Sequence, residues 1–209
     1  MRHHLVIFAK SPRLGRAKRR LAADIGSVAA LRFYRTLLAQ TLRRLASDPR
    51  WRTWLAVTPE PARWPPRPQR IGQGTGDLGR RMDRAMRALP PGPAVLVGAD
   101  IPAIGAAPVA AAFRALGRAD AVFGPAADGG YWLVGLRRRP RMPVAFRGVR
   151  WSGPHALADT VANLAGLEVW RVATLADVDD GADYARWRAA GQRSVSRGIS
   201  STKLQGRKR

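Results

Sequence analysis

The sequence predicts an α/β protein in which one domain is built around an open sheet. The strongest evidence is the segment Ala94–Pro102, which opens with the apolar run Val95–Val97 and then stops at Gly98 and Ala99. This run has the length and the β-branched content of a buried central strand. A length of 209 residues is enough for one such domain with a full hydrophobic core.

The composition excludes several classes of function. The chain has no cysteine, so it can form no disulfide, thiolate nucleophile or cysteine-ligated metal site. No apolar run reaches the length of a membrane span. The start, Met1–His4, leads directly into a strand-like run and lacks the core and cleavage site of a signal peptide. We therefore expect a cytoplasmic protein without a membrane span.

The formal net charge of +23 comes mainly from arginine. Such a charge could indicate nucleic acid, phosphate-rich ligands, or a proteome that simply prefers arginine to lysine. The arginines are scattered over predicted helix faces and loops, without a dense stripe or interleaved aromatic residues. We therefore expect no specific nucleic-acid partner.

The first predicted strand, His4–Ala9, leads into a basic loop that ends at Lys18. A strand followed by a glycine- and proline-containing loop with several cations, ahead of a helix, is typical of phosphate binding. Gly15 lets the backbone approach a ligand, and Lys10 and Lys18, with Arg13 and Arg20, supply positive charge. Neither a Walker loop nor a GxGxxG motif is present, and an ordinary basic turn is the alternative interpretation.

The next elements are predicted to serve packing. Ser27 can cap a helix that runs to about Ser47, and Trp51–Thr58 is predicted as a strand, followed by the proline-rich loop Pro59–Pro68. The helix has one apolar face, formed by Val28, Leu31, Tyr34, Leu38, Leu42 and Leu45.

A glycine-rich segment, Arg70–Arg81, precedes the next helix. Its glycines reduce stability through chain entropy, which indicates that the backbone lies close to a ligand. Asp77 can cap the helix that follows. The alternative is a plain flexible loop with a helix cap. The buried face of this helix is predicted to contain Leu78, Met82, Ala85, Met86 and Leu89.

Asp100 follows the central strand directly. Ligands of open α/β sheets bind beyond the carboxyl ends of the strands, and carboxylate oxygens suit a hard cation such as Mg²⁺, which in turn binds phosphate. Pro102 pushes Ile101 toward an extended conformation, so the chain leaves the sheet at this point. A helix cap is the alternative role for Asp100.

The second half begins with an alanine-rich helix, Pro108–Leu116, and a short strand, Asp120–Gly124. Asp128-Gly129-Gly130 is predicted as a tight turn that returns the chain as the strand Tyr131–Leu136. A hairpin alone would account for this turn. His155 is predicted at the start of a helix that ends at about Leu164, in a structural role.

A late strand, Glu168–Ala173, is followed by the acids Asp177, Asp179 and Asp180. One of these acids could share a cation with Asp100, or one could cap the helix Ala182–Ala189, and the two roles can fall to different acids. From residue 192 to residue 209 apolar periodicity ends, so we expect a basic disordered tail after a single domain, 1–191.

Six segments in this order resemble a family of bacterial glycosyltransferase-A-like proteins, the domain of unknown function numbered 2064, related to 2-phospholactate guanylyltransferase. Some members are described as arsenosugar-biosynthesis glycosyltransferases. The resemblance extends over nearly the whole chain to about residue 190. The segments are FAKSPRLGRAKRRL (8–21), QGTGDLGRRM (73–82), GADIP (98–102), ADGGYWLVGL (127–136), FRGVRWS (146–152) and DVDD (177–180).

This resemblance implies the nucleotide-diphospho-sugar transferase fold, a single-domain α/β/α sandwich around a mostly parallel sheet. It implies Mg²⁺ or Mn²⁺ on Asp100 and Asp179, catalytic roles for Lys18 and Asp100, a nucleotide or nucleotide sugar, and a small-molecule acceptor. The nucleotide-binding residues that we expect are Lys10, Pro12, Gly15, Lys18, Gln73, Gly74, Asp77, Leu78 and Gly79. The substrate-binding residues that we expect are Asp128, Gly129, Gly130, Tyr131, Trp151 and Ser152.

The sequence departs from the family pattern at three places. The family commonly has Thr or Ser where this chain has Ala99, Thr where it has Arg19, and a DVDT-like motif where it has DVDD. No carboxylate is lost, and Lys18 is retained, so the metal assignment is unaffected.

Two reactions fit these residues. In glycosyl transfer an acceptor attacks the sugar carbon of a nucleotide sugar; this is our first hypothesis. In nucleotidyl transfer a substrate phosphate attacks a nucleoside triphosphate and pyrophosphate leaves. A non-enzymatic module that binds nucleic acid is a third, weaker hypothesis. The sequence carries no signal for an oligomeric state.

Overall fold

The computed structural model of the chain describes residues 2–59, 62, 64 and 68–200, with side chains described up to residue 190. The described residues form a seven-stranded sheet in the order β3-β2-β1-β4-β6-β5-β7. Only β6 runs antiparallel to its neighbours, β4 and β5, and the other neighbouring pairs are parallel. The strands are β1 (His4–Lys10), β2 (Arg52–Thr58), β3 (Gln69–Gly72), β4 (Ala94–Gly98), β5 (Ala121–Pro125), β6 (Tyr131–Leu136) and β7 (Val169–Arg171).

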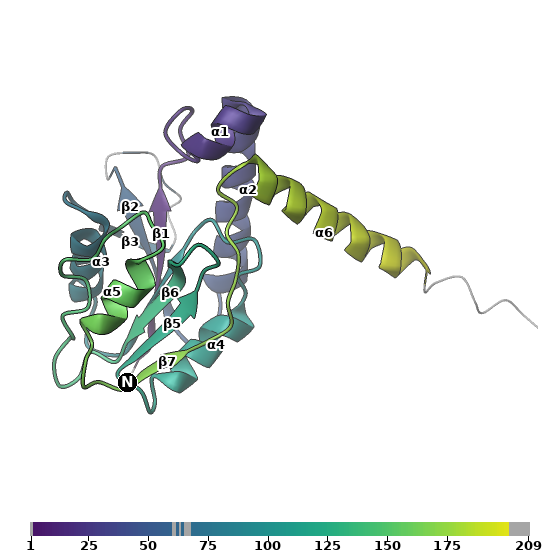
Figure 1. Cartoon of the computed structure of the whole chain (residues 1–209). Helices are drawn as coiled ribbons and strands as arrows, with labels where there is room; N and C mark the ends of the chain where they lie inside the picture. Colours follow the sequence, from purple (N-terminus) through teal and green to yellow (C-terminus); the bar gives the residue numbers. More distant parts are fainter. Residues whose placement is uncertain (1, 60–61, 63, 65–67, 201–209) are drawn as a thin grey trace, which may run out of the picture.

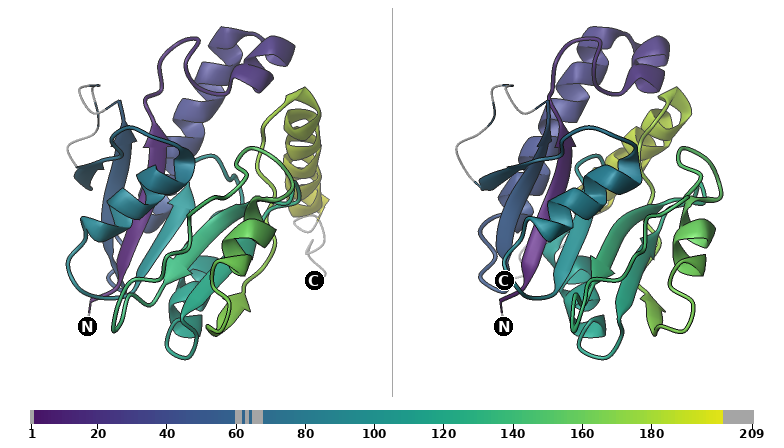
Figure 2. Two further views of the ribbon diagram at one scale, coloured as in Figure 1. Left: turned by 60° about the vertical axis from the view of Figure 1, so that its left-hand side comes forward. Right: turned by 90° about the vertical axis from the view of Figure 1, so that its left-hand side faces the viewer.

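Helices cover both faces of this sheet (Figures 1 and 2). One face packs against α2 and α4, and the opposite face packs against α3 and α5. The expected α/β/α sandwich around a mostly parallel sheet is therefore confirmed. The helices are α1 (Arg19–Ile25), α2 (Ser27–Leu45), α3 (Leu78–Arg87), α4 (Ala106–Ala115), α5 (Ala156–Ala162) and α6 (Gly181–Ser200).

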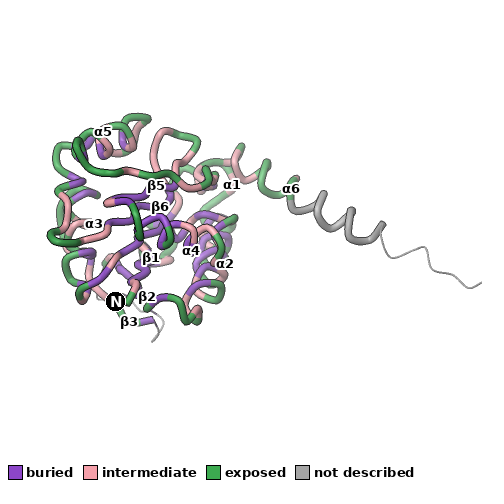
Figure 3. Tube along the Cα trace, turned by 90° about the horizontal axis from the view of Figure 1, so that it is seen from below, coloured by how far each residue is buried: buried purple, intermediate pink, exposed green. Residues whose placement is uncertain are grey.

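The strands alternate their side chains between two cores. On β1, Leu5 and Ile7 belong to the core under α2 and α4, whereas Val6 belongs to the core under α3 and α5, with Phe8 packed against it. Figure 3 shows the buried strands at the centre with exposed helix surfaces around them. Burial of one such aliphatic side chain contributes about 1.5–3 kcal/mol, so the sheet forms a rigid base for the loops at its edges.

The helix pair at the start of the chain differs from the sequence prediction. Ser27 was predicted to cap the second helix, but it is the first residue of α2. Gly26, with φ of 85°, occupies the cap position, and no side chain caps the helix. Only Gly26 separates α1 from α2, and glycine adopts this positive φ without the strain of a side chain. Val28, predicted to be buried, is 55% exposed.

The last helix is longer than predicted. It extends to Ser200, whereas the sequence predicted a helix ending at Ala189 and a disordered tail from residue 192. Its first turns pack against the α1–α2 pair, where Phe33 contacts the rings of Tyr184 and Trp187, and the Gly181 amide donates to Asp24. The rest of α6 extends away from the sheet (Figure 1). Residues 201–209 lie outside the described residues, so the expectation of a tail there stays a prediction.

No helix in the described part of the chain is both long enough and apolar enough to span a membrane.

Candidate functional site

A cavity of about 620 Å³ lies at the carboxyl ends of the parallel strands. The loops that follow β1, β4 and β5 reach it, together with the segment that leads from β7 to α6. The carboxyl ends of parallel strands share one edge of a sheet, which is why segments far apart in the sequence meet here. The charged residues that line the cavity are Lys10, Arg16, Lys18, Arg19, Arg20, Arg81, Asp100, Asp128, Asp177 and Asp179.

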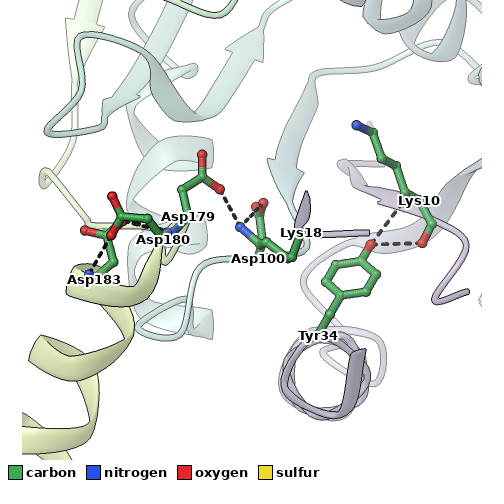
Figure 4. A network of polar contacts seen from close by, with 7 residues as sticks. All are labelled: Lys10, Lys18, Tyr34, Asp100, Asp179, Asp180 and Asp183. Carbon is green, nitrogen blue, oxygen red and sulfur yellow. Dashed lines mark hydrogen bonds and ion pairs between the residues drawn. The ribbon is translucent and has the colours of Figure 1, made fainter. Parts of the chain in front are cut away.

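Lys18 lies at the centre of the charged residues. Its Nζ is 2.9 Å from Asp100 Oδ2 and 2.7 Å from Asp179 Oδ1 (Figure 4). The Lys18 side chain is only 5% exposed, whereas the side chains of Asp100 and Asp179 are 36% and 42% exposed. The backbone of Lys18 has φ of 50°, a left-handed conformation that is unusual for a residue with a side chain. Such strain is commonly found at functional sites.

The two carboxylates fix the charge of this lysine. Burial alone would lower the pKa of Lys18, but Asp100 and Asp179 outweigh burial, and the pKa is raised well above its usual value. Lys18 is therefore a permanent cation at neutral pH, and the two carboxylates face a single positive charge between them.

The adjacent acids Asp179 and Asp180 have different roles. Asp180 Oδ1 accepts a hydrogen bond from the Asp183 amide at 2.9 Å, and Asp183 Oδ2 accepts from the amides of Asp179 and Asp180. This reciprocal arrangement caps the first turn of α6. The cap leaves the Asp179 carboxylate free of helix capping, and it points toward Lys18 (Figure 4).

Asp177 adds a further carboxylate to the cavity. Burial, followed by the negative charges of Asp179 and Asp100, raises its pKa to about 6. The acids of the cavity are therefore close enough to repel one another, even with Lys18 between two of them.

Tyr34 of α2 holds the end of β1 in place. Its hydroxyl donates to the Lys10 carbonyl at 2.9 Å and accepts from the Lys10 amide at 3.0 Å. The ammonium group of Lys10 lies away from the Lys18 cluster (Figure 4). Lys10 thus supplies a separate positive charge to the same cavity.

The glycine-rich segment has a structural explanation that the sequence did not provide. Gln73 is fully buried, and its Nε2 donates to the carbonyls of Ala9 and Ala56, which joins β1 to β2. A Cβ on Gly79 would lie 2.7 Å from both the Phe146 carbonyl and the Trp151 ring. Gly79 thus permits close packing within the protein. Asp77 caps α3 through the Arg80 amide, as predicted.

The turn between β5 and β6 forms another part of the cavity. Asp128 accepts a hydrogen bond from the Gly130 amide at 2.9 Å, and Gly129 has φ of 84°. A Cβ on Gly129 would meet the backbone of Pro154 at 2.4 Å, so glycine lets the turn pack against the start of α5. The predicted hairpin is confirmed by the antiparallel pairing of β5 and β6.

Aromatic side chains lie next to this turn. Tyr131 and Trp151 contact each other edge-to-face, with ring centroids 6.5 Å apart, and both line the cavity with Trp132 and Ser152. Ser152 has φ of 64°, a second left-handed non-glycine residue in the cavity. The cavity therefore combines cations, carboxylates and aromatic surface.

The structure brings together only part of the predicted site. The predicted residues that line the cavity are Lys10, Lys18, Leu78, Asp100, Asp128, Gly130, Tyr131, Trp151, Ser152 and Asp179. Those placed outside its lining are Pro12, Gly15, Gln73, Gly74, Asp77, Gly79 and Gly129. The residues of the lining that sequence reasoning did not select include Arg16, Tyr34, Arg81 and Trp132.

Different reasons explain the residues that were missed. Tyr34 and Trp132 belong to apolar patterns, so the sequence offers no signal that they border a cavity. Arg81 lies three residues after Leu78 on α3, and residues at this spacing share one face of a helix. Because Leu78 was predicted to bind the nucleotide, the same reasoning could have selected Arg81. Arg16 stands in the basic loop, where many cations are equivalent by sequence.

The Asp100–Asp179 pair suits a divalent cation. Lys18 Nζ occupies the position between the two carboxylates, where a cation bound by both would lie. Carboxylate oxygens are ligands that Mg²⁺ and Mn²⁺ prefer. Within the described residues, His, Cys, Asp and Glu side chains do not gather in a metal-binding group of three or more. A cation here would therefore take further ligands from water and phosphate oxygens, as Mg²⁺ often does.

Comparison with protein families identifies the class of this chain. Residues 36–153 match the family described as "Uncharacterized protein conserved in bacteria (DUF2064)", and the match covers more than half of the chain. The chain belongs to this family. Comparison with curated proteins gave no match.

Solved structures place the fold among nucleotide-diphospho-sugar transferases. A candidate nucleotide-diphospho-sugar transferase from Desulfovibrio desulfuricans G20 is 32% identical, with a TM-score of 0.80, over 86% of this chain and 84% of that one. A CMP:2-keto-3-deoxy-manno-octonic acid synthetase in complex with CTP is 14% identical, with a TM-score of 0.54, over 93% and 100%. Rv0371c from Mycobacterium tuberculosis H37Rv, in complex with manganese, is 15% identical, with a TM-score of 0.52, over 89% and 97%.

Proposed function

We propose that this protein is a divalent-metal-dependent transferase that uses a nucleotide, and that its donor is a nucleotide sugar. The observation that carries the proposal is the position of Lys18 between Asp100 and Asp179 in a cavity whose other cations, apart from Arg81, come from the segment that runs from the end of β1 into α1. The descriptions of the compared structures, which name nucleotide-diphospho-sugar transfer, CTP and manganese, support the same class of reaction.

The proposal assigns the phosphates of the donor to the basic side chains of the cavity. Lys10, Arg16, Arg19 and Arg20 line it without a carboxylate partner among the described residues. Charge-assisted hydrogen bonds to phosphate are about twice as strong as neutral ones. Asp100 and Asp179 would hold Mg²⁺ or Mn²⁺, which when bound would neutralise phosphate charge. Lys18 Nζ holds this position between the two carboxylates in the structure, so the metal would replace its ammonium group there.

The acceptor is assigned to the aromatic and acidic part of the cavity. The rings of Tyr131 and Trp151, which are only partly buried, offer apolar surface for a ring-shaped acceptor or sugar. In the proposed step the acceptor oxygen bonds to the sugar carbon, the bond between that carbon and the diphosphate oxygen breaks, and the acceptor proton passes to a carboxylate. Asp128 lies in the cavity as a carboxylate that can take it.

Nucleotidyl transfer is the second candidate, and one observation favours it. One of the compared structures, the CMP:2-keto-3-deoxy-manno-octonic acid synthetase, is in complex with CTP, a nucleoside triphosphate of the kind that nucleotidyl transfer uses as donor. In that reaction a phosphate oxygen of the acceptor bonds to the α-phosphorus and pyrophosphate leaves.

A product assay separates the two candidates. The full chain is incubated with Mg²⁺, a set of small hydroxyl and phosphate compounds as acceptors, and either nucleotide sugars or nucleoside triphosphates, after a thermal-shift screen has found which nucleotides raise the melting temperature. Release of a nucleoside diphosphate from a nucleotide sugar supports glycosyl transfer, and release of pyrophosphate supports nucleotidyl transfer. If no nucleotide of either kind raises the melting temperature, the proposed class of reaction is wrong.

A further inference from the structure

Arg81 of α3 is a cation of the cavity for which protein stability offers no explanation. Its guanidinium lies over the Phe8 ring, with Cζ 5.7 Å from the ring centroid, and Arg81 is one of the residues that line the cavity. Burial lowers its pKa, and no compensating partner raises it. Among the described residues, no carboxylate lies within ion-pair distance of Arg81. A partly buried charge without a counter-ion reduces stability.

The hydrogen bonds of Arg81 are also incomplete. Its Nη2 donates to Gln73 Oε1, but its Nε is fully buried and has no partner among the described residues. Such a group costs free energy and calls for an explanation. Its Nη1 makes no hydrogen bond within the described residues either, but this atom is not fully buried.

Gln73 fixes the direction of this guanidinium. The amide group of Gln73 donates to two backbone carbonyls, those of Ala9 and Ala56, so its oxygen must face Arg81. Because both strands and the glutamine are buried, the arginine is held at the edge of the sheet by a rigid acceptor. The arrangement positions a cation at the cavity although the protein gains no ion pair from it.

Two other buried cations, Arg138 and Lys18, have hydrogen-bond or ion-pair partners within the protein. Arg138 is partly buried, and burial lowers its pKa, but it donates to the carbonyls of Leu89, Pro90 and Gly92, which explains its place. Lys18 is neutralised by two carboxylates. Arg81 has neither kind of compensation.

We propose that Arg81 binds the phosphate oxygens of the nucleotide. This inference rests on the proposed nucleotide site and adds a residue that the sequence did not select. The nucleotide is favoured as the source of the phosphate because Arg81 lies over Phe8 of β1, the strand that leads into the basic loop, and lines the same cavity as the cations of that loop.

The test measures binding of inorganic pyrophosphate, UDP and GDP to the full chain by calorimetry at one fixed Mg²⁺ concentration. The variant Arg81→Gln removes the charge but keeps a donor for Gln73, and Arg81→Lys keeps the charge. The matched control is Arg80→Gln, because Arg80 precedes Arg81 on α3, is 79% exposed and does not line the cavity.

We expect Arg81→Gln to weaken binding of pyrophosphate and of the better diphosphate by roughly tenfold or more, because a hydrogen bond to a charged group is lost. The affinity of Arg81→Lys for these probes should lie between the affinities of Arg81→Gln and the wild type. If Arg81→Gln fails to fold, the affinity of Arg81→Lys decides whether Arg81 binds phosphate. Arg80→Gln should stay within about twofold of the wild type.

Three results would overturn the inference. If Arg81→Gln binds the probes as Arg80→Gln does, Arg81 is not a phosphate ligand and the proposed nucleotide site still stands. If only pyrophosphate binding is weakened and both diphosphates bind normally, the assignment to the nucleotide is wrong. If the wild-type chain binds none of the probes, the proposed function fails together with the inference.

Discussion

The cations and the acids of the cavity are assembled in different ways. Most of the cations come from one continuous segment, residues 10–20, which follows β1 and opens α1. The acids Asp100, Asp128, Asp177 and Asp179 come from the ends of β4 and β5 and from the segment after β7. The cations are therefore neighbours in sequence, whereas the acids are brought together only by the order of strands in the sheet.

This difference explains the special place of Lys18. It is the residue of the basic segment whose side chain is buried between acids from two other segments. Lys18 thus connects the cations, which are neighbours in sequence, to the acids, which the sheet topology brings together. Changes on either side of this contact should have large effects, and changes away from it should have small ones.

The largest effect is expected from the variant Asp179→Asn, with Asp180→Asn as its matched control. Asp179→Asn removes a proposed metal ligand, so metal-dependent turnover should fall on the order of a hundredfold or more, because preorganised charge at the reacting group is lost. Asp180→Asn removes the same charge one residue away, but Asn caps a helix about as well as Asp. Its turnover and melting temperature should stay close to those of the wild type. Equal losses of turnover in both variants would mean that Asp179 has no special role.

Lys18→Met should reveal the repulsion between the two acids. Without Lys18, Asp100 and Asp179 face each other uncompensated, and partial exposure limits the loss of stability to about 1–2 kcal/mol at neutral pH. Added Mn²⁺ can take the place of the ammonium group, so it should raise the melting temperature of Lys18→Met more than that of the wild type. A Mn²⁺ shift no larger than that of the wild type would contradict the view that lysine and metal compete for one position.

A smaller effect is expected at the other end of the sheet, at His4. His4 Nδ1 accepts from Trp54 Nε1 at 3.2 Å, and burial, with smaller effects from nearby arginines, lowers the pKa of His4. The unfolded chain therefore binds a proton more readily than the native state does. This part of the stability is present above the usual histidine pKa of about 6.5 and is lost as the pH falls through it.

The measurement for His4 is urea unfolding of the wild type and of His4→Asn at pH 7.5 and pH 5.5. The difference in unfolding free energy between the two proteins should shrink at the lower pH. The comparison with the variant is needed because the raised pKa of Asp177 acts with the opposite sign. A difference that is independent of pH would show that His4 does not titrate in this range.

The smallest effect is expected from removal of residues 195–209. Among the described side chains, the packing contacts of α6 lie in its first turns, at Tyr184 and Trp187, and the described lining of the cavity ends at Asp179, ahead of this helix. The truncated chain should keep the melting temperature within about 2 °C, and nucleotide binding unchanged. A large drop in melting temperature would show that the end of the chain is docked.

The sequence predicted what depends on local pattern. Six of the seven strands, the hairpin at Asp128–Gly130 and the cap at Asp77 follow from hydrophobic period and turn chemistry, and the structure contains them, whereas β3 was not predicted. The sequence could not predict that Gln73 would join two strands or that Gly79 would pack against Trp151. Both facts depend on residues far away in the chain.

The same limit applied to the charges. Lys18 was expected to bind the ligand and Asp100 the metal. Whether these two side chains form an ion pair depends on how the segments that carry Lys18, Asp100 and Asp179 are placed in space. The order of the segments was visible in the sequence, whereas the distances between their side chains were not.

The central claim is that Asp100 and Asp179 form a metal-dependent nucleotide site. The most direct measurement is the Mg²⁺ dependence of UDP and GDP binding to the wild type and to Asp100→Asn, by calorimetry. Asp100→Asn keeps the size of the side chain and removes its charge, so it should fold normally. The account predicts that Mg²⁺ strengthens binding of at least one diphosphate by roughly tenfold or more in the wild type and has no effect in Asp100→Asn. Equal strengthening by Mg²⁺ in both proteins would contradict it.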